Sequence, residues 1–209
     1  MNKILKYFRK QSVIVSLCFL VPLFVLIFSS CSEDYKGLEI SFDPFLADEN
    51  SDFAVTMQRE KVSEDRMDIK IMIGNIPDEQ VYSAEFGISF DPELIAFKGY
   101  KESEFFGAVG TASVAIDLKN QDTGIIYVSI IRGAEGLPPE NNHGKLIELN
   151  FQAIAYIEDK AEKGVCKSLT RDSNFSYLDF INYQLFDDKN QFFTGISWYG
   201  GVYCIFENK

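Results

Sequence analysis

Catalysis would depend on very few residues in this chain. His143 is the only histidine, and it lies in a loop rich in proline and asparagine between Gly136 and Gly144. No G-x-S-x-G sequence accompanies it, so a Ser-His-Asp hydrolase is unsupported. The 31 acidic residues allow many accidental carboxylate pairs, and their spacing marks none of them as a glycosidase pair. We therefore expect a protein that is not an enzyme.

Metal and cofactor motifs are also lacking. Residues 187–191 read Asp-Asp-Lys-Asn-Gln, which offers oxygen ligands but lacks the glycine and the distant glutamate of an EF-hand. This segment favours a turn, with weak calcium binding as the alternative. The cysteines form no C-x-x-C pair that would suggest zinc, and no glycine-rich loop precedes a helix that could bind phosphate. We predict neither a metal nor a cofactor.

The first 31 residues have the order of an export signal. Four basic residues precede an apolar run over 12–28, and Ser29, Ser30 and Cys31 follow it,. The sequence Phe28-Ser29-Ser30-Cys31 resembles the lipobox of bacterial lipoproteins, in which the cysteine is lipidated, and the acidic residues behind it resemble a Bacteroidetes surface tether. This resemblance implies a signal peptide over 1–30, a lipidated tether over 31–51 and anchorage at the outer membrane with surface exposure. An uncleaved anchor helix and an unlipidated Cys31 are the alternatives. A short apolar patch at 38–42 interrupts the polar tether and could dock on the domain that follows,.

Charge restricts the partners that the exported part can bind. Residues 1–31 hold four basic side chains and no acidic one, so the part after Cys31 carries a formal charge of −15, compared with −11 for the whole chain. Such a surface repels phosphate backbones, which argues against nucleic acid as a partner. It also repels anionic lipid, which leaves the lipid on Cys31 as the predicted membrane contact.

Two cysteines remain after Cys31. Outside the cytoplasm, Cys166 and Cys204 could pair, and a loop of that size would stabilise the fold by roughly 4 kcal/mol. Two buried free thiols are the alternative.

Short strands dominate the rest of the sequence. Apolar residues alternate with polar ones from Met67 to Ile73 and from Tyr82 to Phe90, which places one face of each strand in a core,. Further short apolar runs follow, separated by turn signals, at 94–97, 112–118, 125–131, 146–157, 175–186 and 192–206,. Eight or nine strands with one apolar face each predict an all-β, two-sheet sandwich over 52–209.

One stretch carries a family resemblance. Residues 67–92, MDIKIMIGNIPDEQVYSAEFGISFDP, resemble the second and third strands of a cohesin domain. The motifs Asn75-Ile76-Pro77 and Phe90-Asp91-Pro92 have the order expected of that family, and the similarity extends over roughly 52–207. The resemblance implies a nine-stranded jelly-roll sandwich, related to carbohydrate-binding modules, that binds dockerin modules of secreted polysaccharide-degrading enzymes.

The resemblance also implies a binding surface on the third strand. Cohesins use one flat sheet face, which here would display Ser83, Glu85, Gly87 and Ser89 to a protein partner. Any solvated strand would show the same polar alternation, so plain solvation is the alternative. A second interpretation is a carbohydrate-binding module of a polysaccharide-capture system, in which Trp198, Tyr199 and Tyr203 form a glycan-stacking platform. Burial of these aromatic rings in the core is its alternative.

Overall fold

The computed structural model describes residues 37–76, 80–133, 143–167 and 171–207. These residues form twelve β-strands and two single-turn 3-10 helices, and there is no α-helix among them. None of the described segments could cross a membrane as a long apolar helix. The predicted signal peptide, its helix and Cys31 lie outside the described residues. Gly37–Lys209 form one compact unit.

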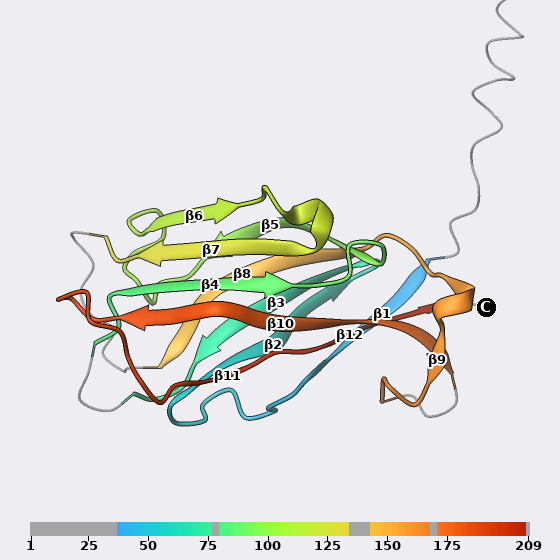
Figure 1. Cartoon of the computed structure of the whole chain (residues 1–209), viewed down its shortest axis with the longest axis horizontal. Helices are drawn as coiled ribbons and strands as arrows, with labels where there is room; N and C mark the ends of the chain where they lie inside the picture. The colour runs from blue at the N-terminus through green and yellow to red at the C-terminus, as the bar shows by residue number, and fades with distance from the viewer. Residues whose placement is uncertain (1–36, 77–79, 134–142, 168–170, 208–209) are drawn as a thin grey trace, which may run out of the picture. The chain divides into compact units, whose positions relative to one another are not determined.

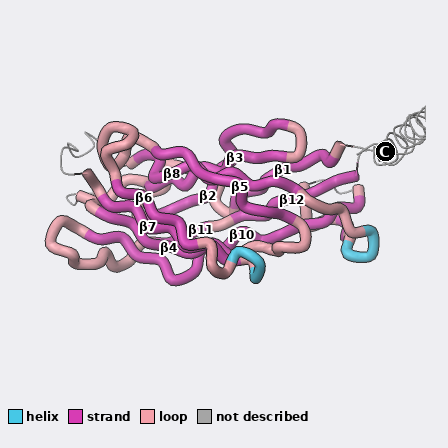
Figure 2. Tube along the Cα trace, turned by 90° about the horizontal axis from the view of Figure 1, so that it is seen from above, coloured by secondary structure: helices cyan, strands magenta, loops and turns pink. Residues whose placement is uncertain are grey.

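The strands make two sheets (Figure 1), one in front of the other in that view. The first sheet has the order β1 (Leu38–Pro44), β12 (Gly201–Glu207), β10 (Asp172–Phe186), β4 (Ser83–Ser89), β7 (Ile125–Ile131) and β6 (Ser113–Asp117), and β9 (Glu162–Lys163) also pairs with β10. The second has the order β11 (Ser197–Tyr199), β2 (Ala54–Ser63), β3 (Arg66–Ile73), β8 (Gly144–Ala153) and β5 (Ile95–Glu102). The short helices are η1 (Gln121–Thr123) and η2 (Glu158–Lys160), drawn in cyan in Figure 2.

Alternating side chains explain the packing of the two layers. Met67, Ile69, Ile71 and Ile73 of β3 are fully buried, as are Ala84, Phe86 and Ile88 of β4. These strands therefore face each other across one continuous apolar core,. β2 and β11 pair in parallel. Because one lies near the beginning and the other near the end of the folded sequence, their pairing closes the jelly roll. The predicted two-sheet, jelly-roll sandwich is confirmed.

The N-terminal boundary of the sandwich differs from the prediction. The sequence placed a tether over 31–51, whereas residues 38–44 form strand β1, paired antiparallel with β12 along its full length. Ile40 and Phe42 bury their side chains in the core. The apolar patch at 38–42 thus belongs to the folded unit, and both sheets with their core lie within Gly37–Lys209. A chain that begins at Gly37 contains every element it needs to fold.

β10 lies within the first sheet, and the crossing from β11 to β12 joins the two sheets. β10 pairs with β12 over Asn174–Leu178 and with β4 over Asp179–Phe186, and a bulge between Ile181 and Gln184 interrupts the second ladder. β11 and β12 flank Gly200, where the chain passes from the second sheet to the first (Figure 1). A Cβ at Gly200 would lie 1.9 Å from the Leu178 carbonyl oxygen, so only glycine fits this crossing.

Candidate functional site

One outer surface of the sandwich is formed by β10, β4, β7 and β6. We call the outward side chains of these four strands the β4 face. Its members follow from the ladder pairings and are Asp179, Ile181, Gln184 and Phe186 on β10, Ser83, Glu85, Gly87 and Ser89 on β4, Ile125, Tyr127, Ser129 and Ile131 on β7, and Ser113, Ala115 and Asp117 on β6. All four residues predicted on the third strand of the family pattern therefore lie on one surface.

Gly87 departs from the prediction that it is displayed to a partner. It is buried on the β4 face because Ile181 and Tyr127, its neighbours across the two ladders, extend over it. A Cβ at residue 87 would lie 2.6 Å from Ile181 Cγ1 and 2.9 Å from Tyr127 Cε1. Ser83 and Ser89 are half-buried and Glu85 is exposed. The strand therefore presents its polar residues around a covered glycine.

The β4 face has an apolar centre and acidic edges. Ile125, Tyr127 and Ile181 are half-buried there, and their side chains surround Gly87 and Ser89. The charged members of the face are Glu85, Asp117 and Asp179. Lys119 Nζ lies 3.7 Å from Asp117 Oδ2, whereas Glu85 and Asp179 form no ion pair within the described residues. Partial burial raises the pKa of the Asp179 carboxyl above its ordinary value,. Half-buried apolar groups beside uncompensated carboxylates suit a partner with apolar and basic residues.

On the outer surface of the other sheet, charged side chains form ion pairs with one another. We call the outward side chains of β2, β3, β8 and β5 the β3 face. Lys101 Nζ lies 2.7 Å from Asp68 Oδ2 and also contacts Glu148, whose second oxygen is 3.0 Å from Lys145 Nζ. Burial alone would raise the pKa of Asp68, but hydrogen bonds from Lys101 and Asn150 outweigh it and lower that pKa,.

Part of the β3 face is also covered. The segment after β1 lies against β2 and β3, where Gln58 Nε2 donates to the Leu46 carbonyl at 2.7 Å. Lys70 Nζ lies 2.7 Å from Glu49 Oε2. Thr56 and Gln58 are buried in consequence. The two faces thus differ in their carboxylates: Asp68 and Glu148 of the β3 face pair with lysines of the chain, whereas Glu85 and Asp179 of the β4 face pair with none among the described residues.

The three aromatic residues of the glycan-stacking prediction do not form one exposed surface. Tyr203 is 0% exposed and belongs to the core, because its side chain points inward from β12. Its predicted place in a glycan-stacking platform is therefore wrong. The ring of Trp198 stacks on Tyr183 at 4.8 Å and meets Phe180 and Phe86 edge-on or tilted. Tyr199 is exposed. The indole ring of Trp198 is therefore largely occupied by contacts with other aromatic side chains of the chain.

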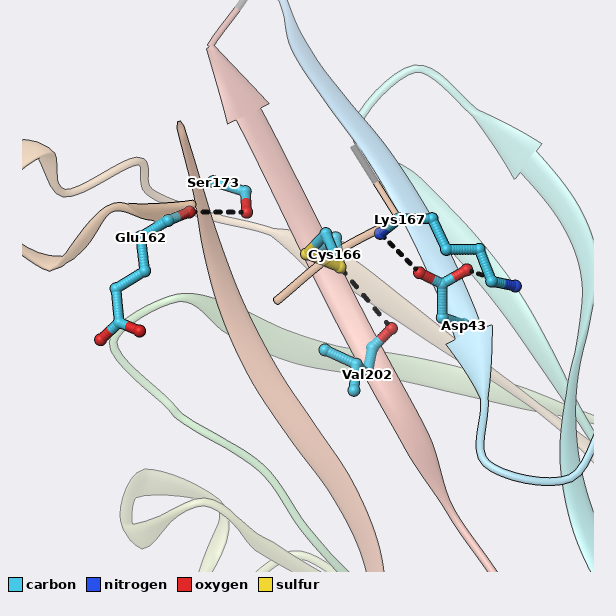
Figure 3. Close-up of a disulfide and its surroundings, with 7 residues drawn as sticks. Asp43, Glu162, Cys166, Lys167, Ser173 and Val202 are labelled. Carbon is cyan, nitrogen blue, oxygen red and sulfur yellow. Dashed lines mark hydrogen bonds and ion pairs between the residues drawn. A yellow bond between two sulfur atoms is a disulfide. The ribbon is translucent and has the colours of Figure 1, made fainter. Parts of the chain in front are cut away.

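Cys166 and Cys204 form a disulfide in the structure, with their Cα atoms 6.1 Å apart. The bond attaches the segment before residue 168 to the outer side of β12 (Figure 3). Lys167 reinforces this attachment, because its backbone N–H donates to Asp43 Oδ2 and its Nζ lies 3.0 Å from Asp43 Oδ1. The loop that contains Cys166 and Lys167 is thus attached to both β12 and β1.

The remaining polar candidates lie apart from the β4 face. His143 lines a groove of about 520 Å³ with Glu102, Glu104 and Lys145. Asp187 Oδ1 accepts hydrogen bonds from the backbone N–H groups of Lys189 and Gln191, so 187–191 is a turn. Within the described residues there is no group of three or more His, Cys, Asp or Glu side chains that could hold a metal ion.

Fold and surface together define a β-sandwich module with one sheet face on which two carboxylates, Glu85 and Asp179, have no ion pair within the described residues. A family model described as the cohesin domain matches residues 54–174, more than half of the 209 residues. The chain therefore belongs to the cohesin family. No curated protein matched the sequence.

Several solved cohesin structures are similar to this chain. The type II cohesin dyad from the adaptor ScaA scaffoldin of Acetivibrio cellulolyticus is 11% identical, covers 75% of this chain and 48% of its own, and has a TM-score of 0.52. The third ScaC cohesin of the same organism, solved with the ScaB dockerin, is 12% identical, with 65% and 86% covered and a TM-score of 0.48. A type I OlpA cohesin–dockerin complex from Clostridium thermocellum is 16% identical, with 79% and 96% covered and a TM-score of 0.47. At such identities the dyad shows the fold alone.

Proposed function

We propose that this chain is a non-catalytic binding module that holds a dockerin-bearing protein on its β4 face. The observation that carries the proposal is the contrast between the two outer faces. Asp68 and Glu148 of the β3 face have lysine partners within the chain, whereas Glu85 and Asp179 of the β4 face form no ion pair within the described residues. Membership of the cohesin family supports the choice of partner class, as do dockerins bound to similar solved cohesins.

The β4 face also has the build of a protein interface. Its apolar centre contains Tyr127, and tyrosine is enriched where proteins bind one another. The face is a sheet surface braced from behind by fully buried Phe86, Ile88 and Val128, so it is rigid before a partner arrives. Such preorganisation lowers the entropy cost of binding.

Direct binding measurements test the proposal. The chain from Gly37 to Lys209 should be titrated with each dockerin module encoded by the same cell, and at least one should bind. Glu85→Arg places a cation beside the apolar centre of the face and should weaken that binding about 100-fold or more. Glu64→Arg makes the same charge change at an exposed residue in the turn between β2 and β3 and should leave affinity unchanged. Equal affinity for both variants, or no binding by any dockerin, would overturn the proposal.

We further propose that Cys31 carries a lipid that anchors the module at the outer membrane, facing outward. The motif behind this idea is the export signal that ends at Cys31,. Two or more acyl chains would hold the protein durably on a membrane. Metabolic labelling with a clickable fatty acid should mark the wild-type protein and not Cys31→Ala. Labelling of both would exclude Cys31 as the lipidated residue, and protection of the cohesin domain from added protease on intact cells would exclude surface exposure.

A further inference from the structure

A groove of about 630 Å³ borders the β4 face along β10. Asp179 and Ser89, which pair across the β10–β4 ladder, belong both to the face and to the lining of the groove. From there the groove extends along β10 past Tyr177 and Phe175 towards η2 and β9. A partner seated on the β4 face therefore has direct access to it.

Aromatic rings line this groove on the β10 side. Phe175 and Tyr177 pack edge to face, with ring centroids 5.5 Å apart. Phe45, 6.1 Å from Tyr177, supports the ring from the direction of β1. Tyr177 remains 49% exposed. An exposed aromatic ring fixed by two others offers a flat surface to a ligand group.

The carboxylates around these rings are mostly without cations. Lys160 also lines the groove, but its Nζ is taken by Glu93 and lies 4.0 Å from Asp91 Oδ2. Asp159, Glu162 and Asp179 line the groove as well, and none of them has an ion pair within the described part of the chain. The groove is therefore net negative, and the rise in the pKa of Asp179 through burial agrees with a carboxylate that lacks a counter-charge.

We propose that this groove receives an arginine side chain of the protein bound to the β4 face. The guanidinium group is planar, stacks on aromatic rings and donates several hydrogen bonds to carboxylates. Tyr177 supplies the ring and Asp179, two residues further along β10, supplies the acceptor, while Glu162 at the other end of the groove adds to its negative charge. This inference rests on the proposed function, because it names the chemistry of the same partner, and it makes a basic residue at the edge of the interface a condition of tight binding.

A titration with a small probe tests the groove alone. ¹⁵N-labelled chain from Gly37 to Lys209 is titrated with acetyl-Gly-Arg-Gly-amide up to about 20 mM, the range expected for one charged contact. The matched probe contains citrulline, which keeps the shape of arginine without its charge. The arginine peptide should shift the backbone amides of 175–179 in the spectrum, and the citrulline peptide should not. Equal shifts with both peptides, or shifts spread over the whole acidic surface, would overturn the proposal.

Variants identify the groups that are responsible. Glu162→Gln with Asp179→Asn keeps the size of both side chains and should weaken binding of the arginine peptide about tenfold. Tyr177→Leu should weaken it severalfold through loss of the ring, and Glu64→Gln should not change it. Unchanged affinity in both groove variants would contradict the proposal. Failure of this inference can be distinguished from failure of the proposed function. If a dockerin binds the wild type but not Glu85→Arg, and the groove does not respond to arginine, only this inference is contradicted.

Discussion

The ring of Tyr127 lies over the backbone of Gly87, so that a Cβ at residue 87 would be 2.9 Å from Tyr127 Cε1. Tyr127 and Gly87 face each other across the β4–β7 ladder. Glycine at this residue lets the tyrosine ring lie flat on the sheet instead of standing away from it. The apolar centre of the β4 face depends on this arrangement.

Gly87→Val should therefore change the surface more than the fold. The added side chain would push Tyr127 and Ile181 outward, and both can move because they lie at the surface. We expect the free energy of unfolding to change by less than about 1 kcal/mol, while dockerin affinity falls at least about tenfold. Urea denaturation and titration calorimetry measure the two quantities. A loss of several kcal/mol with intact affinity in the remaining folded protein would contradict this role for Gly87.

The alternation of apolar residues was sufficient to predict β3, β4 and the sandwich, because each of these strands buries one complete face. It failed to predict β2, where Thr56 and Gln58 are buried although they are polar. Their burial comes from the segment after β1, which supplies the Leu46 carbonyl to Gln58. Such a tertiary contact leaves no periodic signal in the sequence.

The site was predictable to a similar extent. The register of β4 correctly placed Ser83, Glu85 and Ser89 on one face, since period two fixes the side of every residue in a strand. The cover over Gly87 depends on Ile181 and Tyr127 from other strands, and the inward direction of Tyr203 depends on how β12 pairs. The charge pairing of the β3 face, which distinguishes the two surfaces, depends on pairs such as Lys101 and Asp68, 33 residues apart.

The disulfide should contribute strongly to stability. In a chain-entropy model, a bond between residues 38 apart stabilises the folded state by about 4 kcal/mol. Cys166→Ala with Cys204→Ala should therefore lower the urea midpoint by the equivalent of about 2–4 kcal/mol. Dithiothreitol should lower the midpoint of the wild type in the same way and have no effect on the double variant. A wild type as stable with the reductant as without it, although its thiols are shown to be free, would refute this contribution.

The Asp68–Lys101 pair should make the free energy of unfolding depend on pH in the acidic range. The pKa of Asp68 in the folded protein lies below its ordinary value of 3.8, so its contribution is present above that value and is lost as the pH falls through the lower, folded value. Asp68→Asn should cost about 1–3 kcal/mol at neutral pH, with the difference from wild type shrinking towards about pH 2. Urea unfolding at several pH values measures this. A difference independent of pH would show that the carboxylate charge is not involved.

Trp198 should act as a structural anchor. Its ring contacts Tyr183, Phe180 and Phe86, so Trp198→Ala should destabilise the fold by about 3–5 kcal/mol. Tyr199→Ala, at the exposed neighbouring residue, should change stability by less than about 0.5 kcal/mol. Thermal unfolding of both variants gives the comparison. If instead Trp198→Ala kept full stability and abolished binding to a polysaccharide, the glycan-platform interpretation would be favoured.

The central claim is that the β4 face, and not the β3 face, receives the partner. Hydrogen–deuterium exchange of the chain, free and saturated with a bound dockerin, tests it most directly. We predict that binding slows exchange in β4, β7 and residues 179–186 of β10, and leaves β3 and β8 unchanged. Protection confined to β3 and β8, or to the turn at 187–191, would contradict the account.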